Sequence, residues 1–333
     1  MLDRAWAALL TLHRRAHLRG LLPRAPLPSP TVALGALRAG GSGKTPAARW
    51  LALRALQHGL IAVVLSPGYR PGQPSAPPRL IHDSRAPSPP SLATLAATAR
   101  ASGDEAAEAL HRLTRPPFTD VTTGRLLWIA GRDRRAAFQL ARAHLDRLPD
   151  LVLLDDGLHH HRVAPHHTVA LLGPGDLTAR LLPCGPLREG PALLDRVDLV
   201  WFHAPTPHSA PEAANATVTS TWLPDAPPPE GPHLLLCATG APARVLASAR
   251  QQGIDVRDLV ALRDHHPYPD RLLREVSARC RRRGLLPLTT LKDYVKIAAR
   301  WDRLSGGTPL SALSGDLQVL SGAERLDALL RTC

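Results

Sequence analysis

The sequence is poor in aromatic residues and in cysteine, and it contains no long apolar run. Aromatic residues make up 4% of the 333 residues, which is few for the stacking platforms of nucleic-acid-binding proteins. The four cysteines are far apart, which argues against a zinc site and a disulfide framework and favours a reducing compartment. They are Cys184, Cys237, Cys280 and Cys333. No stretch approaches the roughly 20 apolar residues of a membrane-spanning helix.

Lysine is also scarce, although the chain is strongly basic. Of 41 basic residues, only Lys44, Lys292 and Lys296 are lysines. In a chain so rich in arginine, a retained lysine indicates a position where a compact ammonium group is preferred to a planar guanidinium. The net charge of +13 favours polyanions such as nucleic acid, phosphorylated small molecules or an anionic membrane surface, and it does not choose among them.

Residues 40–46 read Gly-Gly-Ser-Gly-Lys-Thr-Pro and follow the apolar run at 32–34. A strand, a glycine turn, Lys-Thr and a helix are the order of a nucleotide-phosphate loop, in which Lys44 reaches the β- and γ-phosphates and Thr45 ligates Mg²⁺. The predicted nucleotide-binding residues are Gly40, Gly41, Ser42, Gly43, Lys44 and Thr45. The usual spacing asks for glycine at the position of Arg38, so a glycine turn that binds nothing is the alternative.

Short apolar runs alternate with helical segments along the chain, which indicates a parallel sheet covered on both faces. The expected strands are 31–35, 61–65, 126–130, 151–154, 169–172 and 234–238, and the expected helices include 44–58, 133–147 and 242–252. We expect an α/β fold in which a P-loop NTPase-like domain (26–205) precedes a smaller α/β domain (206–333), whose end can pack back on the first. The proline-rich segment 204–232 marks the boundary, and 71–90 reads as a loop.

The N-terminal segment, residues 1–25, is predicted to form an amphipathic helix. Leu2, Trp6, Leu9 and Leu10 recur at helical spacing, and basic residues follow. An apolar face with tryptophan and nearby basic side chains is typical of a helix at a membrane surface. A helix docked on the protein core is the equally weighted alternative.

Three further segments contain candidate chemistry. Asp155 and Asp156 end an apolar strand, where one of them can hold Mg²⁺, although a capping aspartate is the alternative. Asp264 and His265 pair a carboxylate with an imidazole, which together can deprotonate a sugar hydroxyl. Arg188 follows a rigid Pro-Cys-Gly-Pro turn and can grip an anionic substrate. The histidines between 159 and 167 read as a solvated loop rather than a metal site.

Taken in order, these segments resemble the tetraacyldisaccharide 4′-kinase family, the lipid A 4′-kinases of Gram-negative bacteria. The likeness runs from the N-terminal helix to about residue 297. The motifs are Gly-Gly-Ser-Gly-Lys-Thr-Pro (40–46), Leu-Ser-Pro-Gly-Tyr (65–69), Gly-Asp-Glu (103–105), Asp-Asp-Gly-Leu-His-His (155–160), Leu-Pro-Cys-Gly-Pro-Leu-Arg-Glu (182–189), Asp-His-His (264–266) and Thr-Thr-Leu-Lys-Asp (289–293).

The resemblance implies a kinase that uses ATP and Mg²⁺ to phosphorylate the 4′-hydroxyl of a tetraacyldisaccharide 1-phosphate, giving lipid IVA. It also implies a site at the cytoplasmic face of the inner membrane, and we expect a monomer with no specific nucleic-acid partner. Asp104 is then the catalytic base and His265 its orienting partner. Asp155 or Asp156 and Thr45 serve the metal, and Arg188 meets the 1-phosphate.

The chain departs from the family pattern at several positions, namely Ala36, Pro67, Ala106, Leu158, His159 and Leu291. Pro67 and Leu291 stand where the family has an arginine and a glutamate. Two rival classes remain. A P-loop NTPase acting as a chaperone or switch shares the loop and the aspartate pair, and a nucleic-acid-binding protein fits the charge. The Asp-His-His and Gly-Pro-Leu-Arg-Glu segments speak against the first rival, and arginines spread along the chain speak against the second.

Overall fold

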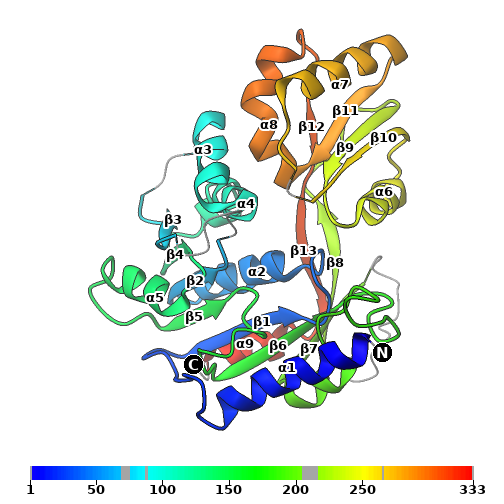
Figure 1. The fold of residues 1–333 in the computed structure, drawn as a ribbon. Helices are drawn as coiled ribbons and strands as arrows, with labels where there is room; N and C mark the ends of the chain where they lie inside the picture. The colour runs from blue at the N-terminus through cyan, green and yellow to red at the C-terminus, as the bar shows by residue number, and fades with distance from the viewer. Residues whose placement is uncertain (1, 69–75, 87–88, 205–216, 265, 332–333) are drawn as a thin grey trace. The chain divides into compact units, whose positions relative to one another are not determined.

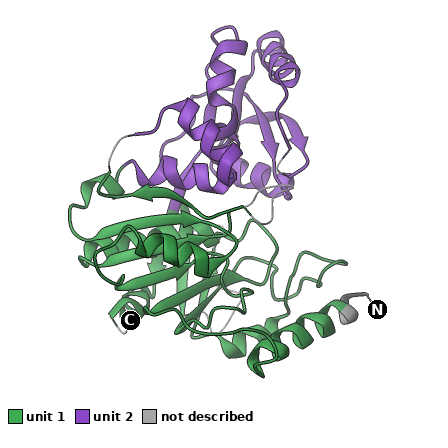
Figure 2. Ribbon diagram, turned by 60° about the vertical axis from the view of Figure 1, so that its left-hand side comes forward, with its two compact units in different colours: residues 1–87, 116–222, 317–333 green, residues 88–115, 223–316 purple. Residues whose placement is uncertain are grey.

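A computed structural model describes residues 2–68, 76–86, 89–204, 217–264 and 266–331. Its internal contacts separate two units, coloured in Figure 2: unit 1 holds residues 1–87, 116–222 and 317–333, and unit 2 holds residues 88–115 and 223–316. The chain thus crosses between the units more often than the expected boundary near 205 implies. Segment 88–115 groups with the later part of the chain, and the C-terminal segment groups with unit 1.

Unit 1 is built on a nine-stranded sheet, counted over the described residues, with the order β13-β8-β7-β6-β1-β5-β2-β4-β3 (Figure 1). Pairing is parallel from β8 through β4, and the edge strand β3 is antiparallel to β4. The strands are β1 (Thr31–Ala36), β2 (Ile61–Ser66), β3 (Arg79–Asp83), β4 (Arg125–Ala130), β5 (Leu151–Leu154), β6 (His167–Leu172), β7 (Leu199–His203), β8 (Val218–Pro224) and β13 (Gly315–Ser321).

Helices cover both faces of this sheet. Successive strand residues point to opposite faces. On one face, Phe138 of α5 (Arg134–Arg142) packs with Ala33 and Val63. On the other face, Trp50 of α2 (Lys44–Gln57) meets Trp201 of β7 edge to face, with ring centroids 5.9 Å apart. The prediction of a helix-sandwiched parallel sheet is therefore confirmed.

Two more helices belong to unit 1. The C-terminal helix α9 (Ala323–Arg331) is joined to α2, because Arg54 donates to both carboxylate oxygens of Asp327, at 3.0 and 2.6 Å. The N-terminal helix α1 (Leu2–Leu18) precedes β1 in the chain and is grouped with unit 1. Both helices thus belong to the unit that carries the predicted phosphate loop.

Unit 2 has its own four-stranded parallel sheet, with the order β10-β9-β11-β12. Helix α6 packs on one face, and α7 and α8 pack on the other. Helices α3 and α4 pack on α8 through a small apolar cluster. The elements are α3 (Leu92–Ser102), α4 (Asp104–Leu113), β9 (His233–Ala238), α6 (Pro242–Gln251), β10 (Val256–Leu262), α7 (Asp270–Arg283), β11 (Leu286–Thr290), α8 (Leu291–Leu304) and β12 (Ser311–Leu313).

The segment 71–90, expected to be a loop, contains strand β3. Prolines and serines flank a short segment, Arg79–Asp83, that pairs with β4. This strand is held by tertiary structure: Arg125 donates to Asp83 at 2.7 Å, and the side chain of His82 is buried. Neither feature can be inferred from local composition, so the expectation of a loop was wrong there. Residues 69–75 and 87–88 lie outside the described residues.

Candidate functional site

The loop that follows β1 has the backbone expected of a phosphate loop. Gly40, Gly41 and Gly43 have φ angles of 74°, 59° and 76°, a left-handed region that glycine enters without steric cost. Gly43 is the N-cap of α2, which begins at Lys44. Arg38, the position where the usual spacing has glycine, donates to Asp176 at 2.6 Å. Its side chain is therefore bound within unit 1 by a buried carboxylate.

Thr45 and Asp155 form a hydrogen-bonded pair beneath this loop. The Thr45 hydroxyl donates to Oδ2 of Asp155 at 2.9 Å. Asp155 is only 2% exposed, and burial raises the pKa of its carboxyl. Its other oxygen, Oδ1, is buried with no hydrogen-bond partner among the described residues. A buried carboxylate with one unsatisfied oxygen is costly unless a ligand completes it.

The pair fits a magnesium ion, a group that the resemblance implies. Mg²⁺ in phosphoryl-transfer sites is typically held by one or two protein oxygens, together with water and substrate phosphates. The Thr45 hydroxyl and the unsatisfied Asp155 oxygen are such donors. Across the described ranges no group of three or more His, Cys, Asp or Glu side chains is placed to hold a metal. The residues thus fit a cation that arrives with phosphate ligands rather than one caged by protein alone.

Asp156 has a different environment from its neighbour. Its oxygens lie 3.5 Å from Nζ of Lys44 and 2.9 Å from Nη1 of Arg188. Burial acts to raise the pKa of Asp156, but the charges of Lys44 and Arg188 outweigh it and hold the pKa at about 2. Its φ of 55° makes it the one non-glycine residue with positive φ in the described part of the chain. This strained backbone turns the two adjacent carboxylates toward different partners.

A cavity of about 190 Å³ opens beside Asp156. Its lining is mostly cationic or imidazole: Pro67, Arg132, Arg134, Asp156, His159 and His160. Arg134 is buried and donates to the carbonyl oxygens of Gly131 and Asp155, at 2.5 and 2.8 Å. Arg132 is exposed. The cavity therefore offers one exposed guanidinium and two imidazoles to an anionic ligand.

Helix α1 is docked on the segment that carries Arg188. Nε1 of Trp6 donates to the carbonyl oxygen of Arg188 at 2.9 Å, and Arg14 forms an ion pair with Glu189. Yet large apolar side chains on and just after α1 stay exposed, including Leu9 (59%), Leu12 (67%) and Leu21 (76%). Of the two interpretations of this helix, docking is thus present, and an apolar face remains uncovered beside it.

Residues 159–161, in the histidine-rich segment after Asp156, are packed, so the interpretation as a solvated loop was wrong for them, whereas His166 is exposed. His159, His160 and His161 are all half-buried. His159 lies 3.4 Å from Glu189, and the ring of His161 lies 5.5 and 5.8 Å from those of His13 and His17. The partners are distant in the sequence, on α1 and after residue 187, which explains why composition alone suggested solvent exposure.

Packing of His161 predicts a pH-dependent stability. Burial, helped by neighbouring histidines, lowers the pKa of His161 from 6.5 to about 4. Between these values the unfolded chain binds the proton and the folded chain does not, so stability falls as the pH falls through this window. In urea unfolding at about pH 7 and about pH 5, we expect His161→Gln to lose less stability on acidification than the parent protein. Equal losses would contradict the prediction.

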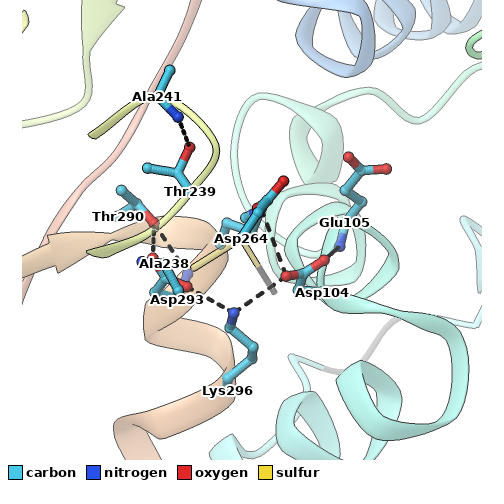
Figure 3. A network of polar contacts seen from close by, with 10 residues as sticks. Asp104, Glu105, Ala238, Thr239, Ala241, Asp264, Thr290, Asp293 and Lys296 are labelled. Carbon is cyan, nitrogen blue, oxygen red and sulfur yellow. Dashed lines mark hydrogen bonds and ion pairs between the residues drawn. The ribbon is translucent and has the colours of Figure 1, made fainter. Parts of the chain in front are cut away.

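Asp104 lies in unit 2, at the first turn of α4, and is 4% exposed. Figure 3 shows it facing the side chain of Lys296 on α8. Nζ of Lys296 lies 3.2 Å from Oδ2 of Asp104, and Nζ of Lys292 lies 3.8 Å from the same oxygen. His265, the expected orienting partner, lies outside the described residues.

The predicted residues therefore fall into two groups. Unit 1 brings together Lys44, Thr45, Asp155, Asp156 and Arg188. Unit 2 holds Asp104.

Sequence reasoning quoted Glu189, Lys296 and Asp293 but did not assign them the supporting contacts that the structure gives them. The scarcity of lysine was the one local signal, since all three lysines contact one of the predicted carboxylates. Leu291, which replaces a family glutamate, is buried in the apolar cluster of α3, α4 and α8.

Comparison with known proteins matches nearly the whole chain to one family. Residues 2–332 match the family model described as "Tetraacyldisaccharide-1-P 4′-kinase". A tetraacyldisaccharide 4′-kinase of Geobacter sulfurreducens is 31% identical, over 90% of this chain and 83% of its own length. That of Shewanella halifaxensis is 30% identical, over 93% and 88%.

The fold is similar to that of a solved structure, LpxK from Aquifex aeolicus in complex with ATP. The TM-score is 0.66 at 22% identity, covering 100% of this chain and 99% of that one. No helix in the described part of the chain combines the length and apolarity needed to cross a bilayer.

Proposed function

Because the chain belongs to the tetraacyldisaccharide-1-P 4′-kinase family, we propose that it transfers the γ-phosphoryl group of ATP to the 4′-hydroxyl of a tetraacyldisaccharide 1-phosphate, giving lipid IVA. The observation that carries the proposal is the Thr45–Asp155 pair at the start of α2, beside Lys44. A hydroxyl, a lysine and an unsatisfied buried carboxylate oxygen at a glycine loop are the parts that hold a triphosphate with its cation.

The nucleotide belongs to the loop of unit 1. Backbone N–H groups of residues 40–43 and the N-terminus of α2 face the phosphates. Lys44 exchanges its contact with Asp156 for the β- and γ-phosphate oxygens. Thr45 and Asp155 would hold Mg²⁺, which neutralises the charge that develops on the phosphate oxygens.

A carboxylate and several cationic groups act on the acceptor, the tetraacyldisaccharide 1-phosphate. Asp104 receives the proton of the 4′-hydroxyl as that oxygen attacks, and His265 is its orienting partner. The 1-phosphate is bound by Arg188 and Arg132. Arg188 lies 2.9 Å from Asp156 in this structure, and Arg132 lines the cationic cavity. A guanidinium fork suits a phosphate better than an ammonium group does.

The assay that tests the proposal is phosphate transfer from ATP to detergent-dispersed tetraacyldisaccharide 1-phosphate. We expect a product that gains one phosphate. Hydrolysis of ATP without a lipid product would contradict the proposal and favour the alternative of a P-loop NTPase that acts as a chaperone or switch.

We further propose that residues 1–25 rest on the cytoplasmic face of the inner membrane, so that the acyl chains of the substrate stay in the bilayer. The exposed leucines of α1 and the basic residues that follow, Arg15 and Arg19, support this. Apolar side chains and cations together bind an anionic lipid surface. The docked contacts of Trp6 and Arg14 leave that face uncovered.

Exposed leucines of α1 should therefore control lipid binding. Full burial of a leucine side chain contributes roughly 1.5–3 kcal/mol, which is the upper limit for each leucine that inserts into the lipid. We therefore expect the double variant Leu9→Ser/Leu12→Ser to bind anionic phospholipid vesicles at least about tenfold more weakly. Co-sedimentation with vesicles measures the change. Leu148→Ser is the matched control, since Leu148 is 39% exposed and is not part of α1. Equal binding by the two variants would contradict the prediction.

A further inference from the structure

Two of the three lysines of this chain converge on one oxygen of Asp104. Nζ of Lys296 lies 3.2 Å from Oδ2, and Nζ of Lys292 lies 3.8 Å from it. Asp104 is 4% exposed, so water screens these contacts poorly. The carboxylate proposed as the proton acceptor thus has an ammonium group at hydrogen-bond distance.

Lys296 is itself held in place by a buried carboxylate. Its Nζ lies 2.7 Å from Oδ1 of Asp293, one turn earlier on α8. Asp293 is fully buried, and its Oδ2 accepts the backbone N–H of Ala238 at 3.0 Å and the hydroxyl of Thr290 at 2.8 Å. Figure 3 shows this chain of contacts, from the end of β9 through Asp293 and Lys296 to Asp104. The ring of Tyr268 lies 5.2 Å from the same ammonium group.

Lys292 is arranged differently, although it is on the same helix. Its Nζ donates to Oδ1 of Asp264 at 3.0 Å, a carboxylate that is exposed. It is farther from Asp104 than Lys296 is, and its hydrogen-bond partner is exposed, whereas Lys296 is paired with buried Asp293. Lys296 is therefore the lysine that links Asp104 to the sheet of unit 2.

We propose that Lys296 is a positioning residue for the phosphoryl-transfer reaction: it holds the Asp104 carboxylate ionised and in one orientation, and Asp293 anchors it to the sheet of unit 2. The proposal rests on the proposed function, in which Asp104 accepts the proton of the attacking hydroxyl. A carboxylate can accept that proton only when it is deprotonated, and a buried carboxylate without a cation tends to be protonated. In such reactions the bond between the attacking oxygen and phosphorus forms late. The position of the Asp104 carboxylate therefore matters more than a high basicity.

Charges of both signs surround Asp104, and two ammonium groups lie 3.2 and 3.8 Å from its Oδ2. Among the described residues, the charged and titratable side chains around it include Lys292, Lys296, Asp264, Asp293 and Tyr268. From α3, the other helix packed on α4, Arg100 is exposed. Burial acts to lower the pKa of Lys292, but Asp104 and Asp264 outweigh it and raise the pKa, so this neighbour also stays cationic. Removing Lys296 takes away the nearest cation and leaves Asp293 as an uncompensated anion nearby.

The experiment compares pH profiles of kcat/KM for four proteins: the parent, Lys296→Met, Lys296→Arg and Arg303→Met. Arg303 is the matched control, because it is an exposed cation on α8. We expect the acidic limb of Lys296→Met to move to higher pH by about one unit or more, the usual effect of losing an opposite charge at this distance. Lys296→Arg should return the limb toward that of the parent, and Arg303→Met should not move it.

A second measurement does not depend on catalysis. Carbon-13 NMR of aspartate-labelled protein follows the ionisation of Asp104, whose signal is identified by its loss in Asp104→Asn. The signal should titrate at higher pH in Lys296→Met than in Arg303→Met. Coincident titrations, or a loss of turnover with an unmoved acidic limb, would overturn the proposal and leave Lys296 a structural residue.

A parent protein that transfers no phosphate would refute the proposed function, whereas the NMR titration would still decide whether Lys296 controls Asp104. Lys296→Arg guards against misfolding of the Met variant, because it keeps a cation beside Asp104. Its Asp104 signal should titrate close to that of the parent, and an unmoved signal in Lys296→Met would overturn the proposal.

Discussion

Replacing Asp104 by asparagine should reduce turnover by roughly 10²- to 10⁴-fold, the usual contribution of a positioned general base. Asparagine has nearly the same shape but cannot accept the proton of the attacking hydroxyl. ATP affinity should stay close to that of the parent, because the side chains proposed to hold the triphosphate and its cation are Lys44, Thr45 and Asp155. Parallel measurements of kcat and of the ATP dissociation constant separate the two effects.

Glu105 offers a matched control for this substitution. It is the next residue of α4, also in the first turn, but its side chain is exposed. Glu105→Gln removes the same charge and should leave turnover almost unchanged. If Asp104→Asn weakened ATP binding as much as it lowered kcat, Asp104 would not be the base.

Replacing Lys44 by methionine should reduce both ATP affinity and turnover, with kcat falling by about 10²- to 10³-fold. The ammonium group lies 3.0 Å from the Ser42 hydroxyl and 3.5 Å from Asp156, at the start of α2 where the phosphates would lie. Methionine preserves the length of the side chain without its charge. Fluorescent-nucleotide titration and the phosphate-transfer assay measure the two losses.

Thr45→Ser is the control, since it changes the adjacent loop residue and keeps the hydroxyl that donates to Asp155 at 2.9 Å. It should retain most of the ATP affinity and turnover. A Lys44→Met protein with normal ATP binding and normal kcat would refute the assignment of residues 40–45 as the nucleotide loop.

The turn between β1 and α2, which we propose as the phosphate loop, was predictable because its signal is local. Glycines with positive φ, a lysine and a hydroxyl stand within six residues, between an apolar run and a helix. The position of Asp155 was predictable for the same reason, because it directly follows the apolar strand β5. The substitution at Arg38 was not interpretable from sequence, because its partner Asp176 lies 138 positions away.

The supports of the site depended on contacts between distant residues. Lys296 is 192 positions from Asp104, and Trp6 is 182 positions from the Arg188 carbonyl that it binds. Composition suggested a solvated histidine loop and a proline-rich loop, whereas packing produced a half-buried imidazole cluster and strand β3. Burial lowers the pKa of histidines such as His160 and His161. The local sequence around them does not show that they are buried.

The sequence by itself determined the α/β class, the glycine loop between β1 and α2 and the position of the aspartate pair after β5, because hydrophobic periodicity and glycine turns act over a few residues. Tertiary structure alone decided the division of the chain into its two units, the docking of α1 and the lysine partners of Asp104. These features depend on the free energy of packing and charge pairing between segments that only the folded chain brings together.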